Sequence, residues 1–103
     1  MKAYKNTTTA LFLRNAGWKE EYKFHETRKW RMDWALPNHK IAIEIEGGVW
    51  VGGRHTSGAG FVKDMEKYNS ATVLGWRILR YTPQQFEEGI CLADIESIVP
   101  EPF

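Results

Sequence analysis

The sequence is poor in cysteine and has no long apolar run. Cys91 is the single cysteine among 103 residues, which excludes an intramolecular disulfide framework and a cysteine-based metal cluster. No apolar stretch approaches the roughly 18 residues that a transmembrane helix needs, and the N-terminal MKAYKNTTTA lacks the apolar core typical of signal peptides. We therefore expect no membrane span, no signal peptide and a reducing, intracellular location.

The composition is nevertheless that of a folded chain. Hydrophobic residues make up 43% of the sequence, charged residues 26% and aromatic residues 14%, which excludes a disordered or collagen-like chain. A length of 103 residues is that of one small domain. Residues 1–103 are therefore expected to fold as a single unit around a modest core.

Charge is unevenly distributed along the chain, although the formal net charge is only +1. Residues 1–40 contain nine Lys or Arg and four Asp or Glu, a balance of +5, whereas residues 41–103 contain five and nine, a balance of −4. A basic N-terminal part is compatible with a face that binds a polyanion. It is equally compatible with charges spread over a solvated surface.

Hydrophobic periodicity and turn signals predict an α/β domain. Helices are expected at 7–16 and 61–74, at a capping box that begins at Thr82, and in a last short segment before Pro100; strands are expected at 21–25, 29–36, 40–47 and 76–82. In the helix at 61–74, one stripe at helical spacing contains Phe61, Met65, Tyr68 and Thr72. The order of elements indicates a small mixed sheet flanked by helices. A segment with six glycines, 47–60, follows the third strand, and a loop of that length inside a small domain usually has a function.

Alternation in the two central strands specifies how they pair. A hairpin about Pro37–Lys40 places Trp34 opposite Ile43 and Met32 opposite Ile45 on one apolar face. A slip by one residue would separate the two apolar faces, so this register is strongly favoured.

The same register places Asp33 directly opposite Glu44, with Cβ atoms about 4.5–5.5 Å apart. Two carboxylates at that distance repel each other unless one binds a proton or a cation lies between them. Mg²⁺ prefers such oxygen ligands, and the carbonyl oxygen of Ile45 could complete a small oxygen cluster. The sequence therefore predicts a divalent-cation site at this end of the sheet.

A purely structural interpretation of the same acids stays open. In it, the polar face of the sheet is solvated, Arg31 pairs with Glu46, and Lys40 or Arg80 neutralises the remaining charge. The surrounding segment 23–31 interleaves basic and aromatic residues, which suits contact with phosphates and bases. Trp30 and Trp34 themselves are expected in the core.

These residues form an ordered set that resembles the active-site signature of the PD-(D/E)xK nuclease superfamily. Within it the chain is most similar to the small stand-alone endonuclease domains related to the very-short-patch repair endonucleases. The resemblance covers residues 24–86 approximately. It rests on Asp33, Glu44-Ile45-Glu46-Gly47-Gly48, His55, Asp64 to Lys67, Leu74-Gly75-Trp76 and Arg80.

The resemblance implies a restriction-endonuclease-like αβββαβ core and a metal-dependent DNA endonuclease that uses Mg²⁺, with Mn²⁺ able to substitute. Asp33, Glu44 and the Ile45 carbonyl would hold the metal. Glu46, which stands where the superfamily usually has Lys, would bind a second metal or accept a proton from the attacking water. The first helix also lacks the acid that many relatives have there.

The resemblance also implies roles for residues after the third strand. His55 would act as a general acid or base, or else be a solvated loop residue. Lys63 would stabilise the pentavalent phosphate, with Lys67 as another candidate, or else be an exposed helix lysine. The residues expected to bind nucleic acid come from both sides of the third strand. They are Arg28, Lys29, Arg31, Arg54 and Lys67.

The implied partner is DNA, cut by a homodimer or nicked by a monomer, in the cytoplasm of a bacterial cell or a phage-infected host. The main alternative is a nucleic-acid-binding module of the same fold without catalysis, which the missing Lys and the missing first-helix acid favour. A glycosidase-like carboxylate pair is a third interpretation, but so short a chain leaves little room for a sugar cleft.

Overall fold

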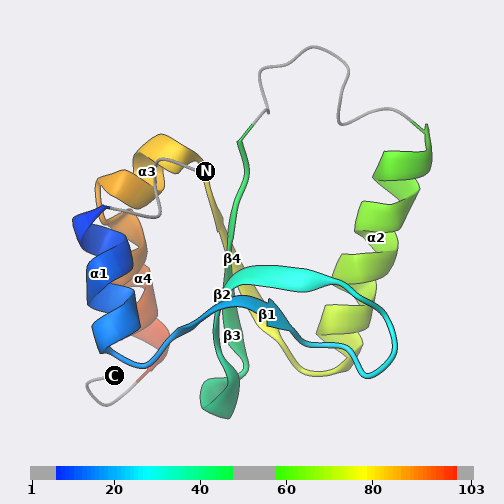
Figure 1. The fold of residues 1–103 in the computed structure, drawn as a ribbon, viewed down its shortest axis with the longest axis horizontal. Coiled ribbons are helices and arrows are strands. Elements are labelled where there is room, and N and C mark those ends of the chain that lie inside the picture. The colour runs from blue at the N-terminus through cyan, green and yellow to red at the C-terminus, as the bar shows by residue number, and fades with distance from the viewer. Residues whose placement is uncertain (1–6, 48–57, 100–103) are drawn as a thin grey trace.

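The computed structural model describes residues 7–47 and 58–99. It is an α/β fold in which a four-stranded mixed sheet has helices on both faces (Figure 1). Along the chain the elements are α1 (Thr8–Asn15), β1 (Lys19–Lys23), β2 (Arg31–Leu36), the 3-10 turn η2 (Pro37–His39), β3 (Ile41–Ile45), α2 (Gly58–Val73), β4 (Arg77–Tyr81), α3 (Pro83–Glu87) and α4 (Ile90–Ile98).

The strands lie in the order β1-β2-β3-β4. β2 is antiparallel to both β1 and β3, whereas β4 runs parallel to β3 after the crossover through α2. The predicted central register is confirmed where Trp34 pairs with Ile43 and Leu36 pairs with Ile41. Lys40 ends the connecting turn in the left-handed region, with φ 52, so β3 begins one residue later than predicted.

Each face of the sheet has its own apolar cluster. α1, α3 and α4 cover one face (Figure 1), where Leu13, Trp34, Phe86 and Ile95 are almost fully buried. The rings of Trp34 and Phe86 are stacked there, 6.2 Å apart. α2 covers the other face, and the smaller cluster on that side contains the residues Met32, Ala35, Ala42, Ala71 and Trp76.

The division of the core shows that β2 changes face at Asp33. Residues two apart in a regular strand share a face, yet Trp34 lies in the first cluster and Met32 in the second. The expectation that Met32 shares the face of Trp34 and meets Ile45 is therefore wrong. Across the pair, Glu21 has a left-handed φ of 49, so both strands of this hairpin depart from regular geometry at the same level.

Three boundaries of this hairpin differ from the predicted ones. β1 pairs with β2 from Lys19, opposite Ala35, to Lys23, opposite Arg31. The predicted strands at 21–25 and 29–36 therefore begin or end two residues away from the observed ones. Beyond the bend, the hairpin extends toward α2 (Figure 1), so that Tyr22 packs in the cluster on that side.

α2 packs on the sheet mainly through its C-terminal half. Ala71 is fully buried, whereas Phe61 and Met65, on the predicted apolar stripe, are 47% and 48% exposed. The N-terminal half of α2 consequently stands beside the ends of β3 and β4 without closing onto them. This separation creates the space in which the candidate site lies.

The predicted capping box is confirmed at the start of α3. The Thr82 hydroxyl accepts the Gln85 N–H at 3.1 Å, and the Gln85 side-chain oxygen accepts the Thr82 N–H at 3.0 Å. Thr82→Ala should lower the free energy of unfolding by about 1 kcal/mol, whereas Thr82→Ser should preserve it. Urea denaturation measures both, with the exposed helical Thr8→Ala as control. Equal losses for Thr82→Ala and Thr8→Ala would contradict the capping role.

Candidate active site

Glu44 is the penultimate residue of β3, and its carboxylate is buried. Its side chain accepts three hydrogen bonds. The Asp33 N–H donates to Oε2 at 2.9 Å, and the Lys67 ammonium and the Tyr68 hydroxyl each donate to Oε1 at 2.8 Å. The residue is only 7% exposed. Burial of an ionised carboxylate is costly unless it is paired and hydrogen-bonded, and both conditions are met here.

Asp33 joins the same network from β2. Its Oδ2 accepts the Ile45 N–H at 2.7 Å, while its own N–H donates to Glu44. Each of the two carboxylates thus accepts a backbone N–H from the other strand. The structure brings Asp33 and Glu44 together, as the register predicts, at the level where β2 changes face.

Glu46 is paired through the neighbouring strand. Its carboxylate forms an ion pair with the Arg80 guanidinium, whose Cζ lies 4.1 Å from the centre of the Tyr68 ring. The expected Arg31–Glu46 pair is replaced by Arg80–Glu46, because Arg80 lies on β4 directly beside Glu44, whereas Arg31 lies beyond the bend in β2.

Tyr68 links the two acidic side chains of β3. Its hydroxyl donates to Glu44 and its ring lies under Arg80, the partner of Glu46. Burial, and then the nearby Glu44 charge, raise the pKa of Tyr68 well above its usual range. The phenol is therefore a neutral donor at physiological pH.

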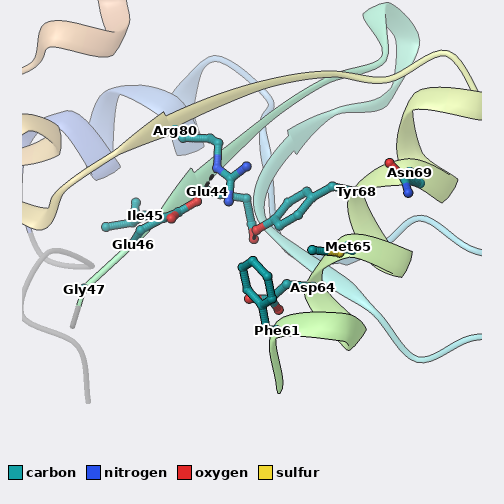
Figure 2. Close-up of a pocket in the computed structure, with 10 residues that line it drawn as sticks. All are labelled: Glu44, Ile45, Glu46, Gly47, Phe61, Asp64, Met65, Tyr68, Asn69 and Arg80. Carbon is teal, nitrogen blue, oxygen red and sulfur yellow. Dashed lines mark hydrogen bonds and ion pairs between the residues drawn. The ribbon is translucent and has the colours of Figure 1, made fainter. Parts of the chain in front are cut away.

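A pocket of about 600 Å³ opens beside this network, between α2 and the ends of β3 and β4 (Figure 2). Its polar wall includes Glu44, Glu46 and Arg80, and Asp64 lines it from α2. Phe61, Met65 and Tyr68 lie on the α2 side in the same view. The pocket therefore combines an acidic wall on the sheet with an apolar and aromatic wall on the helix.

The charge around the pocket favours a cation. Among the residues that the structure describes, four carboxylates lie in the network or line the pocket, those of Asp33, Glu44, Glu46 and Asp64, together with two cations, Lys67 and Arg80. The formal balance is −2. Residues of both signs thus surround the site, with the excess negative.

The oxygen donors fit a hard divalent cation in kind. Mg²⁺ typically binds through one or two carboxylates, with water and substrate phosphates in the other positions, and Asp33 and Glu44 supply two from adjacent strands. Within residues 7–47 and 58–99, no group of three or more His, Cys, Asp or Glu could hold a metal. A cation here would take its remaining ligands from water or a substrate phosphate, and it would share Glu44 with Lys67.

Of the two lysines predicted as site residues on α2, Lys67 contacts the site, whereas Lys63 is exposed. Lys67 lies one turn further along α2, ends on Glu44 and is only 15% exposed in its side chain. Tyr68 was not predicted as a site residue. Its place on the predicted apolar stripe of α2 is the signal that could have identified it, because that stripe faces the sheet.

The other predicted residues are divided between exposed and undescribed positions. Arg28, Lys29 and Arg31 are exposed on and beside the β1–β2 turn. Arg54 and His55, with most of the glycine-rich segment, lie outside the residues that the structure describes. The Ile45 side chain is buried in the first apolar cluster, and its N–H, as noted, binds Asp33.

Comparisons of the chain with family models, with curated proteins and with solved structures found no match. Among the helices of the described residues, none is both long and apolar enough to cross a membrane.

The Lys67–Glu44 pair should contribute to stability through the cost of leaving Glu44 alone. Lys67→Met should lower the free energy of unfolding by about 3 kcal/mol, because a buried charge loses its counter-ion. The exposed Lys63→Met should change it by less than about 0.5 kcal/mol. Urea denaturation of both variants checks this difference.

The double variant Glu44→Gln/Lys67→Met serves as the control for the pair. It removes both charges and should recover part of the stability that Lys67→Met loses. Losses that simply add in the double variant would show that the two side chains do not interact.

Proposed function

We propose that this chain is a metal-dependent DNA endonuclease that hydrolyses phosphodiester bonds at the Asp33–Glu44–Glu46 end of the sheet. The observation that supports it most is the buried Glu44 carboxylate, held between the backbone of Asp33 and the ammonium group of Lys67. Two acids on adjacent strands and a lysine are the functional groups that the PD-(D/E)xK signature combines. The observed order of helices and strands also agrees with an αβββαβ core of the restriction-endonuclease type.

Lys67 supplies the cation that the sequence signature lacks. The superfamily usually has a Lys two residues after the second acid, where this chain has Glu46. Here an ammonium group reaches the same acid, Glu44, from α2 at 2.8 Å. We therefore transfer to Lys67 the role of stabilising the phosphate that the sequence first suggested for Lys63.

In the proposed reaction a water molecule attacks the phosphorus, a new P–O bond forms, and the bond to the leaving oxygen breaks. Asp33, Glu44 and the Ile45 carbonyl would hold Mg²⁺, or Mn²⁺ in its place. When bound, the metal would polarise the phosphate and lower the pKa of water. Glu46 would accept the proton of the attacking water, with Arg80 turned from it to a phosphate oxygen. The Lys67 ammonium stabilises the charge that develops on the phosphate.

The resemblance alone supports the further parts of this proposal. DNA as substrate, His55 as a general acid or base, and a location in the cytoplasm of a bacterial cell or an infected host belong to it. Whether two copies act together on the two strands, or one copy nicks a single strand, follows from the cleavage products.

A second candidate is a nucleic-acid-binding module of the same fold without catalysis. Two ion pairs, Lys67–Glu44 and Arg80–Glu46, neutralise the acids of β3, and this observation favours it. The two candidates differ in whether a folded protein that binds DNA also cuts it.

The cleavage of supercoiled plasmid tests the proposed function. Wild type should nick or linearise it with Mg²⁺ or Mn²⁺ and not with EDTA, because the phosphate is polarised only when the metal is bound. Glu44→Gln should bring cleavage to background, whereas the exposed Glu87→Gln on α3 should cut like wild type. A folded Glu44→Gln variant that still cuts would reject this active site.

A folded wild type that binds DNA and cuts neither plasmid nor branched or mismatched substrates would instead support the binding module.

The two lysines of α2 provide a matched comparison of catalytic roles. Lys67→Arg keeps the charge beside Glu44 but not the compact ammonium group, and cleavage should fall by roughly 100-fold, as for loss of one donor to a developing oxyanion. Lys63→Met should retain cleavage within about twofold, because its side chain is exposed. Single-turnover rates of cleavage of supercoiled plasmid measure both effects. The reverse order of effects would return the role to Lys63.

A further inference from the structure

The turn between β1 and β2 is an ordered structure of its own. The His25 Nδ1 accepts two backbone N–H groups, from Thr27 at 3.2 Å and from Arg28 at 3.0 Å. The imidazole also meets the edge or face of the Trp30 ring at a centroid distance of 5.2 Å. A side chain that satisfies two successive turn donors fixes the path of the backbone, and with it the origin of the Arg28 side chain.

Trp30 is the base of this turn. It is half-buried and belongs to neither of the two apolar clusters, so its expected place in the core is wrong. Its ring stacks with that of Phe24 at 6.2 Å and 14°, and the Arg28 guanidinium lies 3.9 Å from its centre. The ring therefore serves as a support for an arginine.

Arg28 is oriented at two points and remains accessible. Besides the contact with Trp30, its Nη2 lies 3.5 Å from a carboxylate oxygen of Glu66 on α2. The two side chains of this pair are 48% and 52% exposed. An ion pair with this exposure contributes little stability. An anion that binds the guanidinium more tightly than the Glu66 carboxylate can therefore replace it while the contact with Trp30 persists.

The charges of the residues around Arg28 favour the binding of an extended polyanion. Segment 23–31 carries four cations, Lys23, Arg28, Lys29 and Arg31, and one acid, Glu26. Arg31 begins β2 and pairs with Lys23, two residues before Asp33 in the candidate site. Basic residues therefore continue along the two strands from the turn toward Asp33.

We propose that the β1–β2 turn is a phosphate-binding surface for the DNA backbone, with Arg28 pre-oriented by Trp30 and with Glu66 as an internal competitor that a phosphate displaces. The planar guanidinium forms two parallel hydrogen bonds to phosphate oxygens, and the ring limits the entropy lost on binding. The identity of the polyanion as DNA rests on the proposed function. The turn would hold the strand outside the cleavage site and would not take part in the chemistry.

Fluorescence anisotropy with a labelled DNA duplex in EDTA tests this surface without cleavage. Arg28→Met should weaken binding roughly tenfold, equally for unrelated sequences, and should reduce the salt dependence by about one phosphate contact. Arg28→Lys should fall between wild type and Arg28→Met, because it keeps the charge and loses the planar fork. Glu66→Gln should bind more tightly than wild type.

The matched control is Arg77→Met. Arg77 is also an exposed arginine, but it begins β4 opposite Ile41, at the end of the sheet away from Glu44. It should bind within about twofold of wild type. Near-ultraviolet circular dichroism, to which all five tryptophans contribute, shows whether the tertiary structure survives each substitution.

Arg28→Met that binds as well as Arg77→Met, or Glu66→Gln that binds no more tightly than wild type, would overturn the proposal. These outcomes are separable from those of the cleavage assay. Cleavage with binding that does not depend on Arg28 rejects this surface alone. Binding that depends on Arg28, with no cleavage of plasmid, branched or mismatched DNA on adding Mg²⁺, rejects the endonuclease and supports the surface.

Discussion

The buried charge of Glu44 is the constraint on which the arrangement around it depends. A carboxylate that is 7% exposed needs donors, and they come from two elements that are distant in sequence: the backbone of β2 and two consecutive residues of α2. Tyr68 in turn fixes Arg80 on β4, and Arg80 holds Glu46. One interior charge thus links β2, β3, β4 and α2.

The departure of β2 from regular geometry is a consequence of the same network. The Asp33 N–H donates to a side chain, and the Ile45 N–H is taken by the Asp33 carboxylate, so groups that ordinarily join strands bind acids here. The hairpin changes face at this level and extends toward α2 (Figure 1). That path brings Arg28 within reach of Glu66 and places a basic turn and an acidic pocket beside the same helix.

Local sequence patterns predicted the features that neighbouring residues determine, such as strand pairing and helix capping. Alternation predicted the pairing of Trp34 with Ile43, and the Thr82 capping box predicted the start of α3. The prediction from alternation failed at Met32. Alternation assumes that every backbone N–H of a strand bonds to the neighbouring strand's backbone, whereas here the N–H groups of Asp33 and Ile45 bond to carboxylates. The choice of Lys67 over Lys63 depends on the rotation of α2 about its axis, which packing on the sheet sets and a helical stripe leaves open.

The energetics of the site favour function over stability as the reason for its residues. Replacing a buried ion pair by apolar side chains of similar volume is often neutral or stabilising, and a chain of 103 residues has a modest core to offset such pairs. Here, however, the Lys67–Glu44 pair lies beside a pocket, and large apolar side chains such as Phe61 and Met65 stay about half exposed on its other wall. A fold optimised for stability would close α2 onto the sheet and bury them. Under the proposed function, the space between the helix and the acids would admit a phosphate group of the substrate, and a cation would accompany it to offset the excess negative charge on the sheet side.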